Sequence, residues 1–132
     1  MFCPSCNNPM IILEFEEIET DYCTNCGGIW LDDGELDLLI ENSEKKQKLF
    51  NSFSEAHSIE EKKIKCPICN KKMIKTFVGT DKDVIIDECK YKHGLWFNTG
   101  EILEVIKKGS VNKENSIIKF LEDVYKNKID EQ

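Results

Sequence analysis

Closely spaced cysteines constrain this chain more than any other feature of its sequence. Two Cys-x-x-Cys pairs, Cys3/Cys6 and Cys23/Cys26, lie near its start. Both sulfurs of such a pair can reach one ion at about 2.3 Å, and two pairs complete a closed tetrahedral site. Thiolates select zinc or iron over hard cations. The N-terminal part of the chain is therefore predicted to bind one metal ion.

The alternative interpretation is a set of redox-active or disulfide-forming pairs. Cys-x-x-Cys motifs also occur in thiol oxidoreductases, but there one pair belongs to a larger βαβ fold than 132 residues supply here. The chain has seven cysteines, and an odd number cannot close into a complete disulfide set. We therefore favour metal binding.

The chain contains a second copy of this pattern. Residues 66–73 match residues 3–10 at five of eight positions, and residues 94–102 resemble residues 28–36. The offsets are 63 and 66 residues, so the second copy has three extra residues between its two ligand pairs. Such an insertion is expected at a loop tip, and the polar turn formers at 79–82 are where we predict it.

The second copy is predicted to form a second metal site. Cys66, Cys69 and Cys89 match the first three cysteines, but alignment on the shared tryptophans puts Lys92 at the fourth position. Lysine is not a structural zinc ligand, so we expect His93 to deliver a ring nitrogen and complete a Cys3His site. Two zinc ions per chain are then expected. Other arrangements stay open: an unoccupied copy, or a fourth ligand from water, Asp87 or Glu88.

Each copy is predicted to contain a hairpin followed by a helix. Apolar and β-branched residues favour strands at 10–16, 18–22, 73–78 and 84–87. Two capping-box patterns then predict helix starts, with the first side chain accepting an amide hydrogen bond and the glutamate reaching back; they are Asp32-x-x-Glu35 and Asn98-x-x-Glu101.

Three helices are expected. The first continues past Leu39, as far as Phe53 unless the polar stretch in between interrupts it, and the second covers 99–108. Apolar residues at helical spacing between Ile117 and Ile129 predict a third, in the tail.

The predicted fold class is a small metal-bound α+β protein. Each copy has roughly 40 residues, a size at which an apolar core alone seldom suffices, so we expect each to unfold without metal. Four segments follow: a first unit with its helix at 1–50, a connector at 51–64, a second unit with its helix at 65–109, and a C-terminal amphipathic helix at 110–132.

The block from Cys23 to Leu36, Cys-x-x-Cys-Gly-Gly-Ile-Trp-Leu-Asp-x-Gly-Glu-Leu, resembles the signature of the transcription-factor-IIB-type zinc-finger family. The resemblance covers about residues 2–42, and about 65–106 resemble the same pattern except at Lys92 and His93. It implies two tandem zinc ribbons, each a β-hairpin with zinc knuckles. In the first, it implies four ligands: Cys3, Cys6, Cys23 and Cys26. The family name does not itself imply a role in transcription.

Charge is distributed unevenly and limits the function. The formal net charge is −7, with thirteen acids and three lysines in residues 1–60 and twelve acids and fifteen lysines in residues 61–132. All eighteen basic residues are lysine, whereas bidentate reading of guanine is chiefly an arginine function. We therefore expect a zinc-binding module that interacts with another protein.

The alternative function is nucleic-acid binding, with lysines contacting phosphates without sequence choice. The lysines concerned are Lys62, Lys63, Lys65, Lys71, Lys72 and Lys75. A thiol redox sensor or an enzyme built on the irregular second site is a third hypothesis. We expect no enzyme, because the sequence shows no nucleophile constellation and no glycine-rich phosphate loop.

Residues next to the ligands have two interpretations each. Trp30 and Trp96 are expected to form the small core of their own ribbon, rather than to stack on a base. The three acids Asp32, Glu35 and Glu101 are expected to cap helices rather than to catalyse. His57 is expected on the surface of the connector.

The tail helix is expected to cover the ribbons or to form a homodimer, with docking to a partner as the alternative. No apolar run exceeds about four residues, against roughly 18 to 20 for a membrane span, so no membrane association is expected. The early first cysteine leaves no room for a secretory signal. We expect a cytoplasmic protein.

Overall fold

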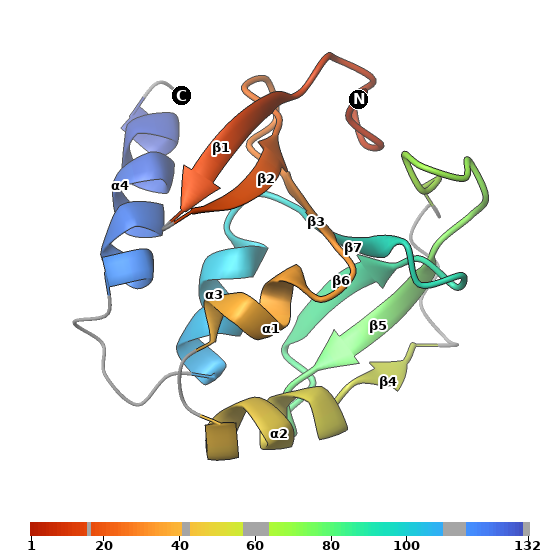
Figure 1. The fold of residues 1–132 in the computed structure, drawn as a ribbon, viewed down its shortest axis with the longest axis vertical. Coiled ribbons are helices and arrows are strands. Elements are labelled where there is room, and N and C mark those ends of the chain that lie inside the picture. The colour runs from red at the N-terminus through yellow and green to blue at the C-terminus, as the bar shows by residue number, and fades with distance from the viewer. Residues whose placement is uncertain (16, 41–42, 57–63, 110–115, 131–132) are drawn as a thin grey trace.

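The computed structural model describes residues 1–15, 17–40, 43–56, 64–109 and 116–130 (Figure 1). Its strands are β1 Ile11–Phe15, β2 Ile18–Tyr22, β3 Ile29–Asp32, β4 Ser54–Glu55, β5 Ile74–Val78, β6 Val84–Glu88 and β7 Gly94–Phe97. Its helices are α1 Glu35–Leu39, α2 Ser43–Asn51, α3 Glu101–Lys108 and α4 Ser116–Asp130. The predicted small α+β fold is confirmed.

All seven strands form one antiparallel sheet in the order β1-β2-β3-β7-β6-β5-β4. The two copies meet at the β3–β7 pair, where Trp30 lies opposite Trp96. On either side of this pair, Ile29 lies opposite Phe97 and Leu31 opposite Leu95. Since Ile29 and Leu95 are equivalent positions, the two copies are related by an approximate twofold axis between the tryptophans.

The predicted hairpins β1–β2 and β5–β6 are present, but β3 and β7 were not predicted. Two residues separate β1 from β2 and five separate β5 from β6, so the three-residue insertion lies at the second hairpin tip, as expected. The missed strands follow the second knuckle of each copy. Their pairing joins residues 66 positions apart in the sequence, which local patterns do not reveal.

Alternation along β3 places two different cores on opposite faces of the sheet. Ile29 and Leu31 belong to the larger core, which the helices cover. Trp30 belongs instead to a smaller cluster that contains Trp96, Met73 and the most buried cysteines. This smaller core is shared by the two copies, so the expectation that each tryptophan packs within its own ribbon is corrected.

A glycine at the start of each central strand, Gly28 just before β3 and Gly94 as the first residue of β7, explains why the tryptophans cross over. A Cβ atom added at Gly28 would lie 2.2 Å from the ring of Trp96, and one at Gly94 would lie 2.6 Å from the ring of Trp30. Each indole therefore packs directly on the backbone of the other copy. Any residue other than glycine at these two positions would place a side chain in the space that the indole rings occupy.

The second helix after each copy, α2 or α4, lies against the hairpin of the other copy (Figure 1). On α4, Phe120 makes an edge-to-face contact with Phe15 of β1, with ring centroids 4.9 Å apart. Beyond α2, the Ser52 hydroxyl accepts a hydrogen bond of 2.8 Å from the backbone N–H of Gly79, after β5. The tail helix α4 thus covers the sheet, which is one of the two roles expected for it.

The apolar face of α4 is buried within the chain's own core. Its buried residues are Ile117, Ile118, Leu121 and Tyr125. These four side chains therefore pack inside the chain. No helix among the described residues combines the length and apolar character that crossing a bilayer requires.

Substituting either glycine is expected to destabilise both copies together. Gly28→Ala should lower the free energy of unfolding by about 1–3 kcal/mol, because the new methyl group overpacks the Trp96 ring. Gly94→Ala should behave alike. The measurement is urea unfolding of the metal-loaded chain, followed by tryptophan fluorescence and circular dichroism.

Glu104→Ala, on the exposed side of α3, is the control and should change stability by less than about 0.5 kcal/mol. If Gly28→Ala matched this control, the tryptophan would not depend on the glycine. Two separate unfolding transitions would also contradict a shared core.

Candidate metal centres

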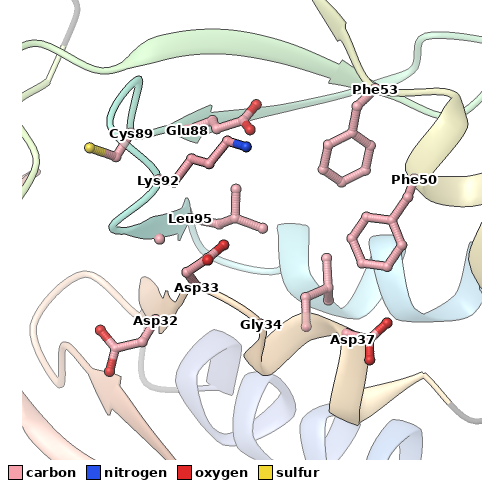
Figure 2. Close-up of a pocket in the computed structure, with 12 residues that line it drawn as sticks. Asp32, Asp33, Gly34, Asp37, Phe50, Phe53, Glu88, Cys89, Lys92 and Leu95 are labelled. Carbon is pink, nitrogen blue, oxygen red and sulfur yellow. The ribbon is translucent and has the colours of Figure 1, made fainter.

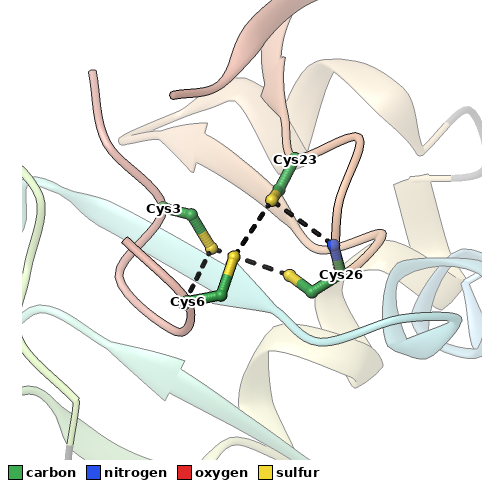
Figure 3. A group of neighbouring side chains, drawn as sticks. All are labelled: Cys3, Cys6, Cys23 and Cys26. Atoms are coloured by element: carbon green, nitrogen blue, oxygen red, sulfur yellow. Dashed lines mark hydrogen bonds between the residues drawn. The ribbon is translucent and has the colours of Figure 1, made fainter. Parts of the chain in front are cut away.

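Four sulfur atoms of the first copy converge on one point (Figure 3). Cys3 and Cys6 lie in the loop before β1, and Cys23 and Cys26 in the loop between β2 and β3. The four Sγ atoms lie within 4.8 Å of one another, with Cys3–Cys26 at 3.6 Å and Cys6–Cys23 at 3.4 Å.

These separations fit a zinc ion and exclude disulfides. A tetrahedron with metal–sulfur distances of about 2.3 Å has edges of about 3.8 Å, close to the observed spacing. A disulfide would instead need about 2.05 Å, and all seven cysteines are free. The donor set therefore matches a closed tetrathiolate site.

Amide groups point at these sulfurs and stabilise their charged form. The Cys3 sulfur accepts from the backbone N–H groups of Ser5 and Cys6, both at 3.4 Å. The Asn8 side-chain amide donates to the Cys6 sulfur at 3.2 Å and lowers the pKa of Cys6 to about 6. Burial, in contrast, raises the pKa of Cys3. A buried thiolate there needs a cation beside it.

The second copy brings together the four residues that the sequence selected. Ligand atoms of Cys66, Cys69, Cys89 and His93 lie within 4.8 Å of one another. The Cys69 and Cys89 sulfurs are 3.8 Å apart, and His93 Nδ1 lies 3.4 Å from the Cys89 sulfur. This set of three thiols and one imidazole also fits zinc.

The carboxylates considered as alternative fourth ligands point elsewhere. Asp87 is buried and forms an ion pair with Lys75 at 2.7 Å. Glu88 accepts a hydrogen bond from the Thr76 hydroxyl at 3.0 Å. Of the three candidates, only His93 lies at the three sulfurs.

A turn that closes one residue earlier carries His93 to this position. In the first copy the left-handed residue is Gly27, with φ of 81°, and its N–H bonds the Cys23 carbonyl. In the second copy it is Lys92, with φ of 61°, whose N–H bonds the Cys89 carbonyl. The side chain after Lys92 then faces the cysteines. A longer imidazole replaces the missing thiol from the next position along the chain.

The surroundings of two thiols in the second copy shift their pKa values in opposite directions. Burial raises the pKa of Cys66 to about 11. A hydrogen bond from the Lys71 backbone lowers the pKa of Cys69. The same contrast between an inner and an outer cysteine is seen in the first copy.

Each knuckle is tied to the other copy by one hydrogen bond. The backbone N–H of Asp33 donates to the His93 carbonyl at 3.1 Å. The hydroxyl of Thr99 donates to the Cys26 carbonyl. Asp33 and Thr99 are equivalent residues, but Asp33 donates from its backbone and Thr99 from its side chain, and their acceptors differ by one position along the repeat. The two bonds are therefore similar and not identical, and local sequence patterns predict neither of them.

The acids next to the ligands form hydrogen bonds within the fold. The glutamate half of each predicted capping box is present, but the half assigned to Asp32 and Asn98 is wrong. Glu35 and Glu101 do reach back, accepting from the N–H groups of Asp32 and Asn98 at 2.6 and 2.7 Å. The Asp32 side chain, however, accepts from the Trp30 indole at 3.0 Å instead of capping α1. Asn98 does the same for Trp96 at 3.1 Å. A buried indole N–H needs an acceptor more than an exposed helix amide does.

The lysines proposed for phosphate binding fall into three groups. Lys65, Lys71 and Lys72 lie around the first knuckle of the second copy. Lys75 is only 6% exposed and pairs with Asp87, so its assignment to a solvent-facing basic surface is corrected. The third group, Lys62 and Lys63, lies outside the described residues. His57, which was expected on the surface of the connector, also lies outside them.

Comparison with known proteins agrees with the first site. Residues 2–42 match the family model described as transcription factor zinc-finger. No curated protein and no solved structure matches the chain. The fold and the two clusters define a small α+β protein with two candidate metal centres, and its residues 2–42 are similar to a zinc ribbon of the transcription-factor-IIB type. Both clusters fit zinc binding.

Removing the indole's acceptor tests this arrangement. Asp32→Ala should lower the free energy of unfolding by about 1–3 kcal/mol, because a buried N–H loses its partner. Asp32→Asn should cost much less, since Asn98 already does this work in the second copy. Urea unfolding and the indole N–H resonance of Trp30 provide the measurements. Equal losses for the two variants would contradict the account.

Proposed function

We propose that this chain is a zinc-binding interaction module in which two structural zinc ions hold one rigid unit. The observation that carries the proposal is that each cluster has four protein donors. Cys3, Cys6, Cys23 and Cys26 would hold one ion, and Cys66, Cys69, Cys89 and His93 the other. Structural zinc sites use four protein ligands, whereas catalytic sites keep one position open.

Zinc would supply the folding free energy of the smaller core. Apparent binding of structural zinc is about 10–16 kcal/mol, which is comparable to the whole stability of a small domain. Both clusters belong to the same buried group as Trp30 and Trp96. The two sites are therefore expected to fold together, and not as independent ribbons.

The second site is tested by its zinc content. The native chain should hold two zinc ions, and His93→Ala should hold one after dialysis against a weak chelator, because three thiolates leave an open vertex. Elemental analysis with protein quantitation measures the ratio.

Lys92→Ala is the matched control, since it alters the neighbouring residue without removing a donor, and it should keep two ions. A His93→Ala chain that retained both ions with unchanged chelator resistance would place the fourth donor elsewhere.

Exposed apolar residues near the start of β1 support a protein partner. Phe2 is 62% exposed and Ile12 is 65% exposed, and Met1 and Ile11 are exposed as well. Phe2 pairs with Pro9 and the Met1 carbonyl accepts from Met10, so the first residues run alongside the start of β1. Exposed apolar surface of this kind favours contact with a partner. Because residues 1–40 carry nine acids and no basic residue, the partner proposed is a protein with a basic surface.

Affinity capture on the zinc-loaded chain, with and without nuclease, tests the proposal. A protein retained after nuclease treatment, and lost with the Phe2→Ser/Ile12→Ser variant, is expected. Glu122→Gln, on α4, is the control and should capture as the native chain does. Retention of nucleic acid alone would contradict a protein partner.

Nucleic-acid binding is a second candidate, favoured by one specific feature. The Tyr91 ring is 50% exposed beside the second site, and the Lys71 ammonium lies 4.5 Å from its centroid. Exposed rings flanked by cations are how single strands are bound. Under this candidate, a single-stranded oligonucleotide should shift in a gel at low salt and lose affinity as salt rises. Tyr91→Ala should abolish the shift, and no shift at low ionic strength would dismiss the candidate.

A further inference from the structure

A cleft of about 410 Å³ opens between the two copies, beside the second metal cluster (Figure 2). Phe50 and Phe53, at the end of α2, form one wall, and Leu95 of β7 lies across from them. Leu36 of α1 adds to the apolar lining. A cavity of this size with apolar walls and a few polar groups is typical of a binding site.

The twofold relation shows what such a cleft can hold. The cleft is lined by Gly34 of the first copy together with Glu88 and Lys92 of the second. The equivalent positions are Gly100 in the second copy, and Tyr22 and Cys26 in the first. All three interact with the phenol of Tyr125 on α4, whose pKa is raised above its ordinary value chiefly by burial.

Tyr125 is buried beside these equivalent positions. It is 4% exposed and belongs to the larger core. It comes from α4, a helix of fifteen residues, whereas the corresponding helix α2 has only nine. Phe50 and Phe53 pack against each other, with centroids 5.4 Å apart, and line the side of the cleft. The cleft beside α2 therefore has apolar walls that suit an aromatic ring. The described side chains of α2 supply no counterpart of Tyr125.

The rim of the open cleft is acidic. Asp33, Asp37 and Glu88 line it, against the single cation of Lys92. In Figure 2, Glu88 and Lys92 lie on the side of the second metal cluster, and Asp33 and Asp37 lie on the side of α1. Asp37 also lies 3.6 Å from the Lys46 ammonium, but remains largely exposed. An entering ring would thus meet negative charge at the mouth.

We propose that this cleft binds an aromatic side chain of a partner protein, held between Phe53 and Leu95 in the place that Tyr125 takes in the other half. Basic residues flank that aromatic residue in the partner and face Asp33 and Asp37. This inference deepens the interaction role proposed above and rests on it for the nature of the partner. It assigns the cleft to the recognition of a tyrosine between lysines or arginines.

Three capped peptides test the chemistry against the full zinc-loaded chain. They are acetyl-Lys-Tyr-Lys-amide, acetyl-Glu-Tyr-Glu-amide and acetyl-Lys-Ala-Lys-amide. Only the first should shift the amide resonances of Gly34, Asp37 and Leu95 in a saturable manner. Equal shifts with the alanine peptide would overturn the aromatic assignment, and equal shifts with the glutamate peptide would overturn the basic flanks.

Charge variants with a matched control locate the binding. Asp33→Asn/Asp37→Asn should weaken the Lys-Tyr-Lys peptide about three- to tenfold at low salt, the range expected for two exposed ion pairs. Glu122→Gln/Asp123→Asn changes the net charge equally on exposed positions of α4 and should leave affinity unchanged. Phe53→Ala should abolish saturable binding. Should that variant fail to fold, the charge pair still decides, because equal effects from both double variants would overturn the site.

Failure here is distinguishable from failure of the interaction role. If the native chain and the Asp33→Asn/Asp37→Asn chain captured the same nuclease-resistant partner equally, the cleft assignment would fall and the module would stand. If no protein were captured by either chain, the interaction role itself would fail.

Discussion

The structure depends on a reciprocal contact in which each tryptophan packs on a glycine of the other copy. Trp30 lies over Gly94, and Trp96 lies over Gly28. Both glycines directly follow the second ligand pair, at the start of a central strand, so each indole packs against the knuckle of the other copy. The antiparallel β3–β7 pair brings the tryptophans together. Two sequence repeats that are each too small for a core thereby become one domain with one sheet.

Zinc ions bound at the two clusters would leave considerable negative charge in the smaller core. A zinc ion with four thiolates carries +2 − 4 = −2, and one with three thiolates and a neutral imidazole carries +2 − 3 = −1. Backbone amides pointing at Cys3 and Cys66 spread this charge, and hydrogen bonds of this kind favour the ionised sulfur. The replacement of a cysteine by His93 reduces the charge of the second site. A tetrathiolate would suit the lysine-rich surroundings of the second copy better than this less negative set of ligands does. Geometry, and not charge balance, therefore explains the choice of His93.

Local patterns in the sequence predicted what local geometry determines. Ligand spacing placed both clusters, and the offset between the repeats placed the insertion at the tip of the second hairpin. The β3–β7 pairing was out of reach, because it joins residues far apart, and the conserved spacing of Gly28 and Gly94 within the repeat was the only trace of it. Asp32 was misassigned for a related reason. Its spacing suits a helix cap, but the need of a buried indole arises only once the tryptophan crosses between copies.

The differences between the two copies indicate where recognition resides. Sheet, knuckles, tryptophans and the reaching glutamates obey the twofold relation, and the fold alone accounts for them. The departures lie at the periphery. The long helix α4 buries Tyr125 in the larger core, while a cleft stays open beside the short α2. At the sheet edges, β4 pairs with β5, while no strand in the described part of the chain pairs with the outer edge of β1. A duplicated fold does not require such asymmetry to be stable. Surfaces left open in only one copy are therefore the places where binding a partner, and not internal packing, best explains the residues present.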